Sequence, residues 1–215
     1  MSRSAIVTGY TGLVGSCLLD RLVSGNEYDP IKLVGRRAPG QSDPRLRLVQ
    51  TELGDLQRLR SELSADDAYC CLGTTLRAAG SRAAFERVDF HMVVDFARAV
   101  HAAGAKRFFL VSSLSADPRS PIFYSRVKGR AEQALSEIGF EALHVLRPSL
   151  LLGARQERRP GEAIAQRLMP AFNRMMIGPV AKYRAVHAED VAAALLALAR
   201  RPDGGVQIHT LPLAS

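Results

Sequence analysis

The fold is decided early in the chain, where residues 3–15 read RSAIVTGYTGLVG. The apolar run at 3–8 predicts a short buried strand, and apolar residues at helical spacing after the glycines predict a helix. Between them Gly9, Gly12 and Gly15 have the spacing G-x-x-G-x-x-G, which permits a tight turn and close approach of a pyrophosphate to backbone amides. The alternative is a plain glycine-rich loop. Its position between a strand and a helix favours a dinucleotide-binding loop.

Apolar runs that alternate with helical patterns continue along the chain. Strands are predicted at 31–34, 46–49, 68–72, 108–111, 143–146 and 206–211, and helices at 85–103, after Pro121 and at 188–200. Such alternation is typical of a parallel sheet connected by helices. We therefore expect an α/β fold, with a single domain over residues 1–215. It should be a doubly wound parallel sheet of about six to seven strands flanked by helices, with a small lid-like C-terminal substrate segment at about 150–185.

The composition indicates a soluble globular protein. Hydrophobic residues make up 47% of the chain and charged residues 23%. No apolar run approaches the roughly 18 residues of a membrane span, and no signal peptide is recognisable, so we expect no membrane association. Cys17, Cys70 and Cys71 form a poor disulfide framework. A reducing, cytoplasmic location is therefore expected.

The charge and the histidines argue against two further classes of partner. The net charge of +8 comes mostly from arginines scattered through the chain without interleaved aromatic residues, so we expect no nucleic-acid partner. The five histidines show no ligand spacing, and no Cys-x-x-Cys pair is present. We expect no metal.

Two arginines follow the second predicted strand, in the segment Gly35-Arg36-Arg37. A fold specific for NAD usually places an acid there to hold the ribose 2′-hydroxyl. Guanidinium groups would instead pair with a 2′-phosphate. The expected cofactor is NADP(H), and the alternative is a pair of solvated surface arginines.

Tyr124 and Lys128 lie four residues apart, one turn of a predicted helix, so their side chains share a face. Tyr124 would be the acid in carbonyl reduction and the base in alcohol oxidation, because a neighbouring ammonium favours the phenolate. Ser113 could donate a hydrogen bond to the substrate oxygen, with Ser112 and Ser115 as rivals. The alternatives are a packed tyrosine, an exposed lysine and serines that satisfy the end of a strand.

Together these motifs resemble the short-chain dehydrogenase/reductase superfamily, and specifically its short atypical branch. The matching segments are residues 8–15, Gly35-Arg36-Arg37, residues 70–75 and 111–113, the Tyr124/Lys128 pair and residues 146–148. The segment 155–162 is similar to the HIV Tat-interactive oxidoreductase-like members of that branch. The resemblance covers nearly the whole chain.

This resemblance implies a Rossmann fold and a set of cofactor contacts. The residues expected to bind NADP(H) are Gly9, Thr11, Gly12, Leu13, Val14 and Gly15 in the loop, Arg36 and Arg37 at the 2′-phosphate, Leu72 and Gly73 along the nucleotide, and Tyr124, Lys128, Leu151 and Arg159 around the nicotinamide half. Asp55 and Leu56 resemble the position that holds adenine. Asp89 stands where many relatives carry Asn, which puts a proton relay through that position in doubt.

The expected function is an NADP(H)-dependent oxidoreductase acting on a small carbonyl or alcohol, with Tyr124, Lys128 and Ser113 as its catalytic residues. The alternative is an NADP(H)-binding redox sensor that regulates a protein partner without robust turnover. Basic residues between 155 and 184 would form a rim for an anionic substrate or the cofactor phosphates, or else ordinary solvated surface. The chain is expected to be a monomer or a homodimer.

Overall fold

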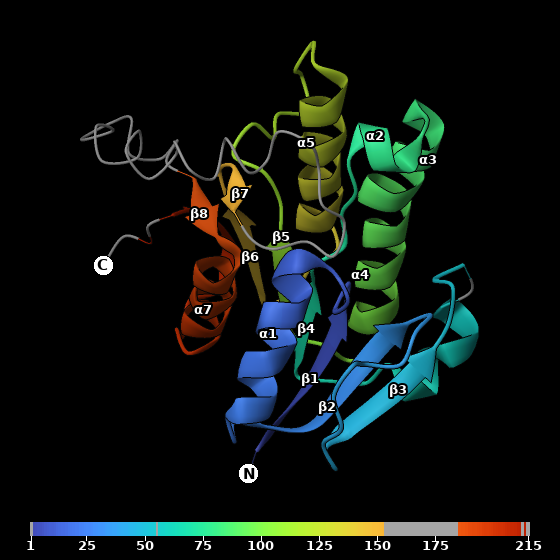
Figure 1. The fold of residues 1–215 in the computed structure, drawn as a ribbon, viewed down its shortest axis with the longest axis vertical. Helices are drawn as coiled ribbons and strands as arrows, with labels where there is room; N and C mark the ends of the chain where they lie inside the picture. Colours follow the sequence, from blue (N-terminus) through green and yellow to red (C-terminus); the bar gives the residue numbers. More distant parts are fainter. Residues whose placement is uncertain (1, 55, 153–184, 212, 214–215) are drawn as a thin grey trace.

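The computed structural model describes residues 2–54, 56–152, 185–211 and 213. Its centre is a seven-stranded sheet in the order β3-β2-β1-β4-β5-β6-β9, with each neighbouring pair parallel (Figure 1). The strands are β1 (Arg3–Thr8), β2 (Tyr28–Gly35), β3 (Leu46–Gln50), β4 (Asp67–Cys70), β5 (Arg107–Val111), β6 (Ala142–Arg147) and β9 (Gly205–Thr210). The expected doubly wound parallel sheet is confirmed.

Helices cover both faces of this sheet, which explains the near-continuous apolar strands. The helices are α1 (Leu13–Ser24), α2 (Leu76–Ala79), α3 (Arg82–Glu86), α4 (Val93–Ala102), α5 (Phe123–Ser136) and α7 (Ala188–Ala199), with a 3₁₀ turn at Leu56–Glu62. On one face α1 and α7 pack against the sheet, and on the other α4, α5 and the 3₁₀ turn do so (Figure 1). The two hydrophobic cores lie on opposite sides of the strands.

The central helix differs from the single helix expected at 85–103. The chain forms α3, then a π-helical turn at Arg87–Met92, and then α4. A π-helical turn holds an extra residue within the helical path, a feature that hydrophobic periodicity does not reveal. The predicted end is confirmed, because α4 stops before Gly104, whose φ is +102°.

The strand order reverses between β1 and β4, since the chain winds from β1 through β2 to β3 before it crosses to the other side. At such a reversal the loops after the two strands diverge and leave a crevice at the carboxyl edge of the sheet, the usual ligand site of this architecture. This is the upper edge in Figure 1.

A small second sheet pairs β7 (Leu151–Leu152) with β8 (Val186–His187) in parallel. Most of the expected lid segment, about 150–185, lies outside the described residues. Within the part of the chain that the structure describes, none of the helices has the length and apolar character of a bilayer span.

Candidate functional site

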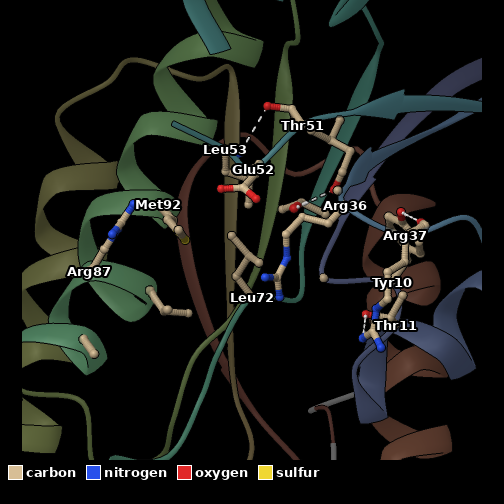
Figure 2. A pocket seen from close by; sticks show the side chains of 16 residues that line it. Tyr10, Thr11, Arg36, Arg37, Thr51, Glu52, Leu53, Leu72, Arg87 and Met92 are labelled. Carbon is tan, nitrogen blue, oxygen red and sulfur yellow. Dashed lines mark hydrogen bonds between the residues drawn. The ribbon is translucent and has the colours of Figure 1, made fainter. Parts of the chain in front are cut away.

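A cavity of about 420 Å³ opens at the carboxyl edge of the sheet, beside the reversal of strand order (Figure 2). Its lining comes from the ends of β1, β2, β3 and β4 and from the π-helical turn with its neighbour α3. The lining residues are 8–11, 34–37, 51–53, Leu72, Ala84, Arg87, Val88 and Met92. A cavity of this size at this place suits one half of a dinucleotide.

The glycine loop is held close against its neighbours, which is why side chains are excluded there. Gly9 has φ +75°, and a Cβ on it would stand 2.5 Å from the carbonyl carbon of Cys71. A Cβ on Gly15 would stand 2.1 Å from the carbonyl oxygen of Gly9. Gly12 precedes α1 without a side-chain cap, and no acid occupies the first turn. The backbone amides at the start of this helix are therefore free of side chains that would block them, and they can donate hydrogen bonds to a pyrophosphate.

Arg36 and Arg37 are exposed just beyond the end of β2. Figure 2 shows the Arg36 side chain reaching into the cavity toward Leu72, whereas the Arg37 side chain turns to Thr11. Arg37 Nη2 donates to Thr11 Oγ1 at 3.1 Å. Together the two arginines place positive charge at the cavity wall beyond the end of β2.

Lys128 on α5 is buried and paired with a buried acid. Its Nζ lies 2.7 Å from Oδ1 of Asp89, which has no exposed surface, and Oδ2 of Asp89 accepts the amide of Thr74 at 2.9 Å. Burial lowers the pKa of Lys128, but the charge of Asp89, joined by that of Tyr124, outweighs burial and raises it. The ammonium is therefore fixed in place and stays charged.

The π-helical turn explains how Asp89 reaches this position. It lies between α3 and α4, and it sends Asp89 toward Lys128 while Arg87, Val88 and Met92 line the cavity. Gly73 sits above the ion pair, since a Cβ there would be 3.4 Å from both Asp89 Oδ1 and Lys128 Nζ. Asp89 thus contacts the predicted lysine directly.

Tyr124 lies one turn before Lys128 and is half-buried. Its ring packs against Phe85 of α3 at 5.5 Å between centroids. Neither Tyr124 nor Lys128 is among the residues that line the cavity. The predicted tyrosine and lysine are brought together with Asp89 on one side of α5.

The three candidate serines have different partners. Ser112 is buried, and its hydroxyl donates a hydrogen bond to Glu132 on α5. The Glu132 carboxylate also forms an ion pair with Arg147, through both of its oxygens. Ser113 is half-buried, and its Oγ lies 3.3 Å from Oγ of the exposed Ser115. Ser112 is thus committed to a structural network, which leaves Ser113 or Ser115 as the substrate-facing candidate.

The other residues predicted from the sequence divide into four groups. Gly9, Thr11, Arg36, Arg37 and Leu72 line the cavity. Val14 is buried in the core, so its backbone alone is available, and Leu56 is buried with 4% exposure rather than lining the cavity. Leu151 is half-buried in β7 and is not among the lining residues. Arg159 and Asp55 lie outside the described residues.

Several lining residues were missed from the sequence: Tyr10, Thr51, Glu52, Leu53, Arg87, Val88 and Met92. For residues 51–53 a signal existed, because they directly follow the third predicted strand and the carboxyl ends of parallel strands meet at one edge. For Arg87 and Met92 none existed, since the π-helical turn alters which side chains share a face.

Comparisons with known proteins agree with this architecture. The model of the NAD dependent epimerase/dehydratase family matches residues 5–213. The rat protein HTATIP2 is 37% identical over 170 residues, which cover 77% of this chain and 70% of that protein. The mitochondrial protein fmp52 of Emericella nidulans is 35% identical over 173 residues, covering 77% and 74%.

Among solved structures, MoeE5 in complex with UDP-glucuronic acid and NAD superposes with a TM-score of 0.74 at 23% identity, covering 96% of this chain and 75% of that one. UDP-glucose 4-epimerase of Thermotoga maritima, solved with UDP-glucose, gives a TM-score of 0.69 at 18% identity, covering 96% and 76%. At these identities the likeness concerns the fold.

Proposed function

The chain belongs to the NAD dependent epimerase/dehydratase family, and from that premise we propose that it is an NADP(H)-dependent oxidoreductase acting on a small carbonyl or alcohol. The match to HTATIP2 confirms the Tat-interactive branch that the sequence motifs indicate. Family and fold support NAD(P) binding. The substrate class, the direction of transfer and the preference for the phosphorylated cofactor are our proposal.

One observation carries the proposal: Lys128 is buried as an ammonium 2.7 Å from Asp89 and one helical turn from Tyr124, next to Gly73 just beyond the carboxyl end of β4. A cation fixed beside a phenol is what proton transfer to a reduced carbonyl requires. Bound NADPH would supply the hydride. The Tyr124 hydroxyl would give its proton to the carbonyl oxygen of the substrate, and Lys128 would stabilise the phenolate left behind.

Two further groups complete the proposed site. The Ser113 hydroxyl would donate a hydrogen bond to the substrate oxygen as negative charge develops there. Lys128 would also hold the nicotinamide ribose. Both roles rest on the position of Ser113 at the end of β5 and of Lys128 on the neighbouring α5.

The preference for NADP(H) is supported by charge at the end of β2. MoeE5 was solved with NAD, whereas this chain carries Arg36 in the cavity and Arg37 beside it. Glu52 also lines the cavity. Glu52 follows β3 and therefore does not occupy the position after β2 where a ribose-binding acid usually stands. That position holds arginine in this chain.

The test is turnover by Tyr124→Phe across a panel of small aldehydes and ketones that the wild type reduces with NADPH. Loss of the proton donor should lower turnover by roughly 10²- to 10⁴-fold, with NADPH affinity within about threefold of wild type. Tyr28→Phe, which removes a buried hydroxyl at the far end of the sheet, is the matched control. Unchanged turnover in Tyr124→Phe would refute the mechanism.

A second candidate is an NADP(H)-responsive regulatory protein, and the Asp89–Lys128 pair favours it. Asp89 already neutralises the charge that would assist Tyr124, so the same residues can hold a ribose without strong catalysis. A protein that binds NADPH, reduces none of the panel and captures a protein partner only when NADPH is present would support this alternative.

We propose a reducing compartment, the cytoplasm, because Cys17, Cys70 and Cys71 are free thiols. The fungal relatives carry the word mitochondrial in their names. Fractionation of cells that express the chain distinguishes the two locations.

A further inference from the structure

Tyr10 occupies an unusual place in the glycine loop. It follows Gly9, yet its side chain turns into the protein and is 3% exposed, within the core formed by α1, α7 and the sheet. A phosphate-binding loop needs small residues for close approach of the ligand. A buried tyrosine at this position must therefore serve something other than the pyrophosphate.

The ring and the hydroxyl of Tyr10 both contact the segment that carries the two arginines. A Cβ added to Gly35 would stand 3.1 Å from Cε1 and from Oη of Tyr10, so the ring lies directly against the last residue of β2. The Tyr10 hydroxyl donates a hydrogen bond to the carbonyl oxygen of Arg37. Burial raises the pKa of Tyr10, although Arg37 opposes this, so the hydroxyl remains a donor.

Within the described residues, a backbone hydrogen bond from the Thr51 amide to the Gly35 carbonyl holds the start of this turn. Residues 36–38 are exposed, and a second hollow of about 420 Å³, lined by Ser16, Asp20 and residues 38–41, lies beside the cavity. Tyr10, Thr11 and Arg37 line both spaces and form the wall between them. The other side-chain tie to the turn's backbone within the described residues is from Gln50, an exposed residue whose Nε2 donates to the Arg36 carbonyl at 3.2 Å.

The Arg37 side chain adds a second link between the same two loops through its bond to Thr11 Oγ1. Tyr10 and Thr11 are thus tied to the backbone and to the side chain of one arginine (Figure 2). The pyrophosphate loop and the end of β2 are thereby fixed to each other.

We propose that Tyr10 is a positioning residue for cofactor specificity: it holds the Arg36-Arg37 turn where both guanidinium groups can meet a 2′-phosphate. This rests on the proposed NADP(H) function. A cofactor without the 2′-phosphate gains nothing from this positioning, so Tyr10 should act on NADPH and leave NADH unaffected.

The experiment is titration of Tyr10→Phe with NADPH and with NADH at fixed ionic strength. Because the variant keeps the ring and loses one buried hydrogen bond, the Kd for NADPH should rise about 5- to 10-fold and that for NADH by less than about twofold. In a double-mutant cycle with Arg37→Ala, the two effects on NADPH should be non-additive, since both act on one turn. Tyr28→Phe should leave both affinities unchanged.

The outcomes are distinguishable. If Tyr10→Phe weakens both cofactors equally, or neither, Tyr10 supports the loop without affecting specificity, and this proposal is wrong while the proposed function stands. If the wild type itself binds NADH as tightly as NADPH, the proposed cofactor preference fails, and the role of Tyr10 fails with it.

Discussion

The two ends of the sheet contain the same three groups, a buried aspartate, a cation and a tyrosine, arranged to opposite effect. At the amino end, both carboxylate oxygens of Asp67 accept hydrogen bonds from Arg107 at 2.6 Å, and the Tyr28 hydroxyl donates a hydrogen bond to the same carboxylate. At the carboxyl end, Asp89 pairs with Lys128, and Tyr124 lies one turn away.

The two ends differ in how many hydrogen-bond partners the tyrosine and the cation have and in how deeply the tyrosine is buried. Tyr28 is buried and also bonded to Tyr69 at 2.8 Å, and Arg107 additionally binds the Ala199 carbonyl at the end of α7. Tyr124 is half-buried in the first turn of α5, where its ring packs against Phe85. A buried charge whose partners are all satisfied holds the fold together, whereas one with a free neighbour is suited to chemistry.

Removing the cation at each end gives the largest expected effects. Lys128→Met leaves the buried Asp89 carboxylate without its counter-charge and should lower the free energy of unfolding by about 3–5 kcal/mol. Arg107→Ala should cost less, because Arg3 Nη1 still lies 3.2 Å from Oδ2 of Asp67. Only Lys128→Met should also reduce carbonyl turnover per folded molecule, by on the order of 100-fold. Denaturant unfolding and steady-state kinetics measure the two quantities.

A double variant separates the two roles of Lys128. Adding Asp89→Asn to Lys128→Met removes the unpaired charge, and the amide oxygen can still accept from Thr74, so part of the stability should return while turnover stays low. Equal loss of turnover in Arg107→Ala would contradict the separation of the two ends.

A third pair, buried His144 with half-buried His209, tests the comparison because neither member is a carboxylate. Burial, assisted by the charge of His209, lowers the pKa of His144 to about 4. The unfolded chain takes up the proton first, near its ordinary pKa of about 6.5. Stability from this group is therefore complete above pH ~6.5, and roughly 3 kcal/mol is lost as the pH falls toward 4.

Unfolding by denaturant between pH 4 and 7 measures this loss. His144→Phe keeps a ring stacked on Phe109, whose centroid lies 5.1 Å away, and should flatten the pH dependence. His187→Gln alters an exposed histidine and should not. A steep acid loss that persists in His144→Phe would assign it to carboxylates whose pKa is lowered in the folded chain, such as Asp66, which accepts hydrogen bonds from the Ser4 amide and hydroxyl.

Which parts of each end could be predicted depends on sequence distance. The glycine loop, the Arg36-Arg37 turn and the Tyr124/Lys128 pair are local patterns, and the structure gathers them at the expected edge. The Asp67–Arg107 pair depends on β4 and β5 lying in register. The Asp89–Lys128 pair depends on the π-helical turn. Neither register nor a π-helical turn can be derived from hydrophobic spacing.

Tyr10 shows a further limit. Its neighbours in the glycine loop predict a ligand contact, but the sequence does not indicate that its ring turns inward to meet Gly35 and Arg37. Side chains in such a loop can lie on either side of it, and the choice depends on whether the opposite strand leaves room. Here the glycine at the end of β2 leaves that room.

The smallest effects concern the two serines at the end of β5, which bring the contrast between structural and chemical groups down to adjacent residues. Ser112→Ala removes a buried donor to Glu132 and should lower the free energy of unfolding by about 1–2 kcal/mol, with turnover nearly unchanged, because Arg147 still holds that carboxylate. Ser113→Ala should leave stability within about 0.5 kcal/mol, since its hydroxyl makes a long contact with exposed Ser115, and should lower turnover by about 10- to 100-fold. Thermal unfolding and kinetics on both variants check this, with Ser115→Ala as the control. If Ser115→Ala loses turnover and Ser113→Ala does not, the hydroxyl that donates to the substrate is that of Ser115 and not that of Ser113.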